Sequence, residues 1–543
     1  MAATLPLHAR AHASPASARP RSLAHAARIV AALLVADLRQ RTRSTRFRVV
    51  ALAVALSAWW CLPPVDAGYM MLAIGDHHRG FYSSAWIGMV LAMLSMMWAL
   101  VGFYLVRGTV QRDFDTRVWQ LLGTTAMRRG AYLAAKWASH VVVMGGLVAA
   151  TLLVGLAAQW ARAEDRHVDV WELVKPSLFI ALPTLSVSAA LAIWFDVVPA
   201  LRRTAGSVLF FFVWTGLLTA GGLGVHHDVQ QRNAGHAPVA QPWASDLGAM
   251  NVLQWSVDHQ VARVAPDALS REGFCLGCGG VDAPPRRFTW TTWEVAPGVL
   301  WGRMLWLAGA LAGVLLAVPL LDWAASRTSA STARGARPPR ELRWLRALLA
   351  PLQRTPRGAL AAAEALVVLR LRPLWWWAAW LPLWGVQAFG APHASALAML
   401  GGWTLLLDVF ARTGLRDVEC RTLAFVASAP GALPRLFAAR AAMLVGLAWI
   451  AVAPGLLHAL AAHPATAATA AAMGASLALW GLAGAALCRS SRPFELVYLV
   501  VAYATTQGLP WLDASARGAG AGLAHLAAAG VAAAVLTVHA RRG

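Results

Sequence analysis

Twelve stretches of about 20 mostly apolar residues follow one another along this chain of 543 residues, each long enough to span a bilayer as a helix. Only 13% of the residues are charged. That is about half the share found in soluble domains, so the chain lacks the polar surface that several soluble domains would need. The sequence predicts an all-α polytopic membrane protein with spans at 47–64, 85–106, 133–158, 176–195, 205–224, 299–321, 373–390, 394–411, 441–461, 466–487, 494–511 and 519–539.

The positions of the basic residues predict the orientation. With the N-terminus in the cytoplasm, 36 of the 47 Lys and Arg residues fall on the cytoplasmic side, as the positive-inside rule requires. We therefore expect both termini in the cytoplasm, with the chain in the bacterial cytoplasmic (inner) membrane and in contact with its lipids. The basic residues lie in short segments between apolar stretches rather than on a polar module, which argues against nucleic acid as a partner.

Two of the predicted cytoplasmic segments carry the same charge pattern. R-D-F-D-T-R begins at Arg112, between spans 2 and 3, and R-D-V-E-C-R begins at Arg416, between spans 8 and 9. A gapless shift of 304 residues superposes them and also places Lys136 on Arg440. Because the segments fall at the same place in each set of six spans, the sequence predicts two parallel six-helix repeats related by an axis along the membrane normal.

This repeat predicts four regions. Residues 1–46 form a cytoplasmic segment, in which 23–41 have the helical spacing of apolar residues that is typical of an interfacial amphipathic helix. The first six-span unit covers 47–321, with an outside loop at 225–298, and a basic cytoplasmic linker covers 322–372. The second unit covers 373–543. A looser match, at a shift of 331, aligns Asp37-Leu38-Arg39 with Val368-Leu369-Arg370.

Several of these features occur together in one known family. An amphipathic helix precedes span 1, and a charged segment then leads through L-L-G-T-T-A or V-A-S-A-P to Lys136 or Arg440 at the start of the third span. This order resembles the permease subunit of type-2 ABC exporters (ABC-2 type), here with two six-span units fused in one chain. Pro430 matches a proline common in the family, whereas Ala126 departs from it.

The resemblance implies that the charged segments, at about 107–125 and 412–429, are coupling helices that dock onto ATP-binding subunits, one copy under each. Loop charges that only set topology need Lys and Arg but not Asp and Glu, and both segments keep acidic residues. We therefore expect ATPase docking by two matching sets of residues: Arg112, Asp113, Asp115 and Arg117 in the first, and Arg416, Asp417, Glu419 and Arg421 in the second.

The chain has no P-loop of its own, because its two lysines, Lys136 and Lys175, are followed by Trp and Pro. We therefore expect a non-enzymatic transport subunit without a cofactor, driven by ATP that a partner subunit binds and hydrolyses. An apolar pathway poor in acidic residues favours export of an amphiphilic or lipid-like cargo.

Two other functions stay open. An ion-coupled carrier of the major-facilitator kind also has a 6+6 arrangement, but the predicted spans are nearly bare of the acids that carry ions, which leaves His140 and His458 as titratable groups. A membrane-embedded enzyme would need a metal or carboxylate cluster, for which only loop 225–298 offers candidates. Its Cys275 and Cys278 favour a small-loop disulfide, over half of a metal site or a redox pair.

Overall fold

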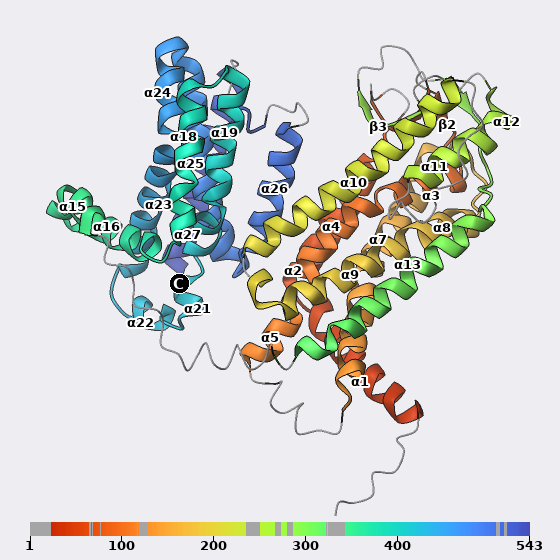
Figure 1. Cartoon of the computed structure of the whole chain (residues 1–543), viewed down its shortest axis with the longest axis horizontal. Coiled ribbons are helices and arrows are strands. Elements are labelled where there is room, and N and C mark those ends of the chain that lie inside the picture. The colour runs from red at the N-terminus through yellow and green to blue at the C-terminus, as the bar shows by residue number, and fades with distance from the viewer. Residues whose placement is uncertain are drawn as a thin grey trace, which may run out of the picture.

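The computed structural model describes residues 23–542, apart from 65–66, 68, 76–77, 117, 119–126, 203, 235–249, 267–272, 280–285, 322, 324–342, 507–510 and 515–518. These residues form two helical lobes (Figure 1). We call residues 23–321 the N-terminal lobe and residues 343–542 the C-terminal lobe.

The N-terminal lobe contains long helices that alternate with short ones. They are α1 (Leu23–Thr42), α2 (Thr45–Trp60), α3 (Ser84–Met93), α4 (Ser95–Val106), α5 (Thr109–Asp115), α7 (Arg129–Arg162), α8 (Val170–Pro176), α9 (Leu182–Val197), α10 (Thr204–Asn233), α11 (Met250–Ser256), α12 (Ala262–Val264) and α13 (Pro297–Leu316). A π-helical turn at Ser177–Ala181 joins α8 to α9 without a break in the rod. It follows Pro176, which has no amide hydrogen to donate to the regular ladder.

The C-terminal lobe is built entirely of helices in its described residues. They are α15 (Arg343–Leu349), α16 (Pro356–Leu369), α17 (Leu374–Ala378), α18 (Trp380–Phe389), α19 (Pro392–Leu405), α20 (Leu407–Thr413), α21 (Arg416–Glu419), α22 (Leu423–Ala427), α23 (Ala432–Ala451), α24 (Ala453–Ala462), α25 (Pro464–Cys488), α26 (Arg492–Thr506) and α27 (Ala519–Arg542). Short 3-10 segments adjoin several of the helices in the two lobes.

All twelve predicted apolar stretches are helical over most of their length, so the protein is a helical, multi-pass membrane protein. Eight helices in the described part of the chain are long and apolar enough to cross a membrane, and the pair α3–α4, bent by 48°, adds a ninth if it forms one span. The stretches 47–64, 373–390 and 494–511 form shorter helices, namely α2, α17–α18 and α26. The count of twelve spans therefore stays a prediction.

The N-terminal lobe also has a small sheet, which the sequence did not predict. Its strands are β1 (Tyr69–Ile74), β2 (His78–Gly80), β3 (Phe274–Gly279) and β4 (Arg286–Phe288), in the order β3-β1-β2-β4. β1 is antiparallel to β2 and β3, and β2 is parallel to β4. The sheet ties the loop before α3 to the predicted outside loop, at the upper end of the lobe in Figure 1.

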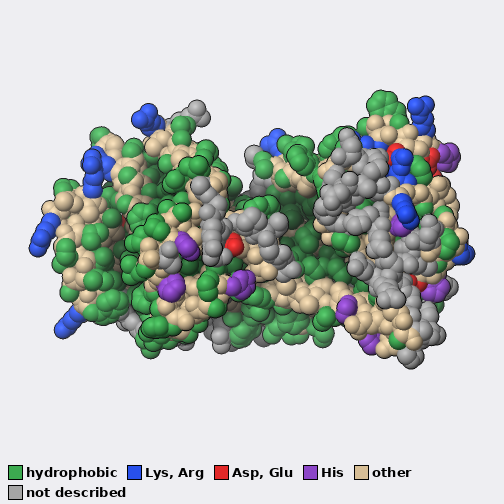
Figure 2. Space-filling view, turned by 90° about the horizontal axis from the view of Figure 1, so that it is seen from above, with side chains coloured by type: hydrophobic (Ala, Val, Ile, Leu, Met, Phe, Trp, Pro, Cys, Tyr) green, Lys and Arg blue, Asp and Glu red, His purple; other side chains and the backbone are tan. Residues whose placement is uncertain are grey.

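The two lobes meet through α26, which packs against α4 and α10. Tyr503 of α26 lies edge-on to Phe211 and Trp214 of α10, with ring centroids 6.0 and 6.1 Å apart. Seen from above, the surface between the lobes is hollowed and lined mainly by hydrophobic side chains (Figure 2). The lobes thus contact along a narrow line rather than across a broad core.

Candidate functional site

The predicted coupling segments form short helices at the lower end of each lobe (Figure 1). In the N-terminal lobe, α5 carries Arg112, Asp113 and Asp115. The side chain of Asp115 and all of Arg117 lie outside the described residues. In the C-terminal lobe, α21 carries Arg416, Asp417 and Glu419, and Arg421 follows it with a left-handed φ of 56°.

In the N-terminal lobe, Asp37, Arg112, Asp113 and Lys136 form a group that we call the first ion cluster. Lys136 Nζ of α7 lies 3.4 Å from Asp37 Oδ1 of α1 and 3.0 Å from Asp113 Oδ2 of α5. Arg112 Nη2 lies 3.7 Å from Asp37 Oδ1. Both aspartates and the lysine are buried. One cation on α7 therefore holds together α1, α5 and α7.

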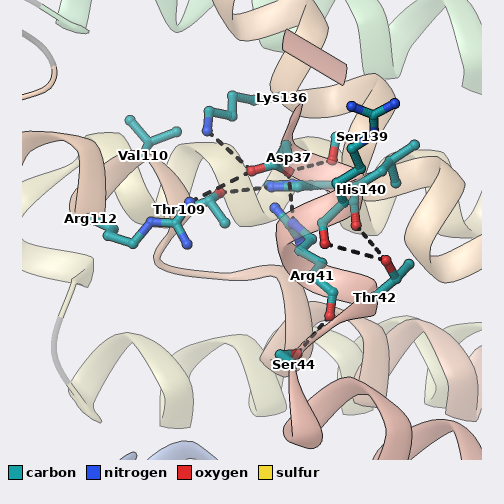
Figure 3. A network of polar contacts seen from close by, with 12 residues as sticks. Asp37, Arg41, Thr42, Ser44, Thr109, Val110, Arg112, Lys136, Ser139 and His140 are labelled. Atoms are coloured by element: carbon teal, nitrogen blue, oxygen red, sulfur yellow. Dashed lines mark hydrogen bonds and ion pairs between the residues drawn. The ribbon is translucent and has the colours of Figure 1, made fainter. Parts of the chain in front are cut away.

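Neighbouring side chains fix both aspartates of the first ion cluster, and Figure 3 shows those around Asp37. The Tyr132 hydroxyl donates a hydrogen bond of 2.7 Å to Asp113, and Arg41 Nε lies 2.7 Å from Asp37 Oδ2. Ser139 also donates a hydrogen bond to Asp37. Burial would raise the pKa of Asp37, but the charges of Arg41 and Lys136 and the Ser139 hydrogen bond outweigh burial and lower that pKa from 3.8 to about 2.

In the C-terminal lobe, Glu364, Arg416, Asp417 and Arg440 form the second ion cluster. Arg440 Nη1 of α23 lies 2.5 Å from Asp417 Oδ2 of α21, and its Nε lies 3.4 Å from Glu364 Oε2 of α16. Arg416 Nη1 lies 2.5 Å from the same Glu364 oxygen. Glu364, Asp417 and Arg440 are buried. As in the N-terminal lobe, a cation on a long helix joins two acids. Glu364 precedes the first apolar stretch of this lobe, and Asp417 follows the second.

The two clusters correspond residue by residue. Arg112, Asp113 and Lys136 become Arg416, Asp417 and Arg440 at the shift of 304. The fourth member differs from the sequence alignment, which placed Asp37 on Val368. In the structure Glu364 makes the contacts that correspond to those of Asp37, one helical turn before Val368.

Asp113 and Asp417 thus point into their own lobes, and the surface of the coupling segments is formed by other side chains. Arg112 exposes 39% of its side chain and Glu419 exposes 49%. The neighbouring helix α22 buries none of its residues, and its Phe425 is 81% exposed. The docking role of the eight predicted residues stays a prediction.

The start of α5 depends on residues that the sequence analysis missed. Gly108, between α4 and α5, has a φ of 86°, which an L-residue with a side chain rarely adopts. The Asp196 carboxylate at the end of α9 accepts hydrogen bonds from the Gly108 and Val110 amides, at 2.6 and 3.1 Å. Asp196 therefore supplies two acceptors to the N-terminal amides of α5, which no local side chain caps.

The other predicted sites lie on elements other than α5 and α21. Cys275, on β3, is disulfide-bonded, whereas Cys61 and Cys420 are free thiols. The side chain of Cys278 lies outside the described residues, so its pairing with Cys275 stays a prediction. His140 Nε2 lies 2.9 Å from the Thr109 hydroxyl, at the start of α5. Among the described residues, no three His, Cys, Asp or Glu side chains gather as a metal site would require.

Comparisons with protein-family models, with curated proteins and with solved structures found no match to this chain.

Proposed function

We propose that this chain is the membrane-spanning permease subunit of an ATP-driven exporter of the ABC-2 type, made of two fused six-span units. The observation that carries the proposal is the recurrence of the ion cluster. A chance match in a charge pattern would not place four corresponding side chains in corresponding contacts in both lobes. A duplicated coupling element explains both the sequence repeat and the geometry.

The ion clusters suit the transmission of force. A partner that moves α5 would pull directly on α1 and α7 through Lys136, and on α9 through the hydrogen bonds to Asp196. In the C-terminal lobe, movement of α21 would reach α16 and α23 through Arg440. Buried ion pairs resist separation because each charge left alone would lack its partner in a low-dielectric site.

An exposed apolar helix beside the second ion cluster provides a docking surface. α22 lies at the lower end of the C-terminal lobe (Figure 1), and its Phe425 side chain is exposed. Exposed charged residues, Glu419 and Arg421, precede α22 in the chain, and an exposed aromatic side chain with polar neighbours is typical of a contact centre with a polar rim. This surface would dock one ATP-binding subunit, and the corresponding part of the N-terminal lobe a second copy.

In this proposal the chain itself has no catalytic residue and no cofactor, and a separate subunit binds and hydrolyses ATP. ATP binding would stabilise one arrangement of the two lobes over another. The narrow contact through α26 and the apolar hollow between the lobes suit the movement of an amphiphilic or lipid-like cargo from the cytoplasmic side of a bacterial inner membrane.

Affinity purification of the tagged chain from its native membrane in mild detergent, followed by mass spectrometry, tests the proposal. We expect an ATP-binding protein at about two copies per permease. A chain that stays alone across several detergents would contradict the proposal and favour an ion-coupled carrier. The next measurement would then be the uptake of a candidate cargo into vesicles under a proton gradient, compared between the wild type and His140→Ala.

A further inference from the structure

A cavity of about 440 Å³ lies between the lobes beside the coupling segments. One wall comes from the N-terminal lobe, at the α4–α5 junction and the start of α10. The other comes from the C-terminal lobe, at α20–α21 and the turn between α25 and α26. A ligand in this cavity would contact both lobes at once.

The wall of the cavity is strongly basic. Two glutamates, Glu419 and Glu495, face five arginines, which gives the lining a net charge of +3: Arg107, Arg202, Arg412, Arg489 and Arg492. The buried carboxylate of Asp196, just behind the wall, leaves an excess of positive charge even when it is counted. Like charges crowded into a partly enclosed space repel each other, and an anion between them removes that repulsion.

Several of the arginines are positioned by contacts within the fold, and Arg412 Nη2 lies 3.0 Å from Glu419 Oε1. Arg107 donates a hydrogen bond of 2.6 Å to Ser207 Oγ, and Arg202 Nε one of 2.7 Å to the carbonyl oxygen of Asp196. Arg492 donates to the carbonyl oxygen of Arg107 across the lobe contact. These contacts position the guanidinium groups before any ligand arrives, which lowers the entropic cost of binding.

Other donors in the wall suit an oxyanion. Ser207, Ser490 and Ser491 bring hydroxyl groups to the cavity. The 15-residue helix α26 begins at Arg492, so the positive end of its dipole lies at the same wall. Arginine forks and hydroxyls together match the several acceptor oxygens of a phosphate group.

We propose that this cavity binds a phosphate group, which joins the two lobes at the level of the coupling segments. The phosphate could be the headgroup of an anionic phospholipid, since basic pockets between membrane helices recognise such headgroups, or it could be inorganic phosphate. The inference does not depend on an ATPase partner, so it stands or fails separately from the exporter function.

Thermal unfolding of the purified chain in detergent tests this site, because a ligand that binds the folded state raises the midpoint by mass action. The chain is titrated separately with phosphatidylglycerol, with phosphatidylcholine and with sodium phosphate at constant ionic strength. The three variants are Arg489→Gln, which removes an exposed cavity arginine, Glu419→Gln, which removes a cavity acid, and the control Arg435→Gln, an exposed arginine outside the cavity.

We expect a stabilising shift with phosphatidylglycerol, phosphate or both, and a much smaller one with phosphatidylcholine. Arg489→Gln should weaken the apparent affinity about tenfold, the loss of one charge-assisted hydrogen bond. Glu419→Gln should strengthen binding, and Arg435→Gln should leave it unchanged. Opposite effects of the two cavity variants cannot come from a general loss of stability.

The two sources give different results. A shift with phosphatidylglycerol alone assigns the site to a lipid headgroup, and a shift with phosphate alone assigns it to a soluble ion. The proposal is overturned if neither ligand stabilises the chain, if phosphatidylcholine acts as strongly as phosphatidylglycerol, or if Arg489→Gln binds like the wild type.

Discussion

Lys136 and Arg440 make corresponding contacts in the two lobes: each joins an acid on the helix before the first apolar stretch to an aspartate that follows the second. The two cations differ in shape. The guanidinium of Arg440 reaches both Asp417 oxygens, at 2.5 and 3.2 Å, whereas the ammonium of Lys136 acts as a single point of charge. The arrangement of acids is thus shared, although the cation that holds it is not.

Replacing either cation by an apolar residue should destabilise its lobe. Lys136→Met leaves Asp37 and Asp113 facing each other without their shared partner, and Arg440→Met does the same to Glu364 and Asp417. We expect a loss of about 3–5 kcal/mol for each, the cost of breaking a buried ion pair, measured as a lower unfolding midpoint in detergent. Arg435→Met, at an exposed position, is the matched control.

Arg440→Lys should be milder than Arg440→Met, because the N-terminal lobe already uses a lysine at the corresponding position. We expect partial loss of stability, since an ammonium cannot reproduce the paired contacts to Asp417. The same unfolding assay measures it. If Arg440→Lys were as damaging as Arg440→Met, charge would not be what the second ion cluster requires at this position.

Phe425→Ser should abolish recovery of the ATP-binding subunit while leaving the fold intact, because the Phe425 side chain is 81% exposed and supports no core. Co-purification in mild detergent measures the association. Phe389→Ser is the control: it replaces an even more exposed phenylalanine, 91%, at the end of α18 rather than on α22. Equal recovery of the partner with both variants would remove α22 from the docking surface.

The low pKa of Asp37 predicts a pH dependence of stability. Because its pKa is about 2 in the folded chain and 3.8 as a free group, the ionised Asp37 stabilises the fold fully above about pH 4, and that contribution is lost as the pH falls toward 2. Its size is about 2 kcal/mol. Unfolding midpoints of the wild type and of Asp37→Asn should therefore differ at neutral pH and converge in acid. A difference that stayed constant with pH would contradict this role.

Gly108→Ala should destabilise the N-terminal lobe. Its φ of 86° is unfavourable for alanine by about 1–2 kcal/mol, and a methyl group there would overlap the Arg492 guanidinium. The matched control is Gly145→Ala in α7, where no atom lies near the added methyl group and the helical backbone favours alanine. The unfolding midpoint should fall for the first variant and stay level or rise for the second.

The sequence predicted the helices well because each apolar stretch is a local signal, readable within about 20 residues. The short charged helices α5 and α21 could be located for the same reason, since the charge pattern there is continuous. The residues that pair with those charges could not be predicted from the sequence. Asp37 lies on the polar side of a predicted amphipathic helix. Among the described side chains of α1, however, it is the one that is buried. Only the packing of α1 on α7 reveals why.

The sequence alignment of Asp37 with Val368 was wrong for a related reason. A shift of 331 matched Leu38-Arg39 to Leu369-Arg370 because these residues are identical. The residues of α1 and α16 that correspond in space are instead determined by the packing of these helices against α7 and α23. The sheet was missed because two of its strands have three residues each and their partners lie far along the chain. Neither the pairing nor the Gly108–Asp196 contact leaves a local pattern.

The pairing of strands also bears on how the chain is made. β2 and β4 pair through His78 and Arg286, and β1 pairs with β3 through Ile74 and Phe274, so the central strands meet their outer neighbours only after about 200 further residues have been synthesised. Until then β1, an apolar strand, has an open edge that could pair wrongly. A fragment that ended before residue 274 would keep that edge exposed, so a fragment of the N-terminal lobe has to reach residue 288 to contain every strand of the sheet.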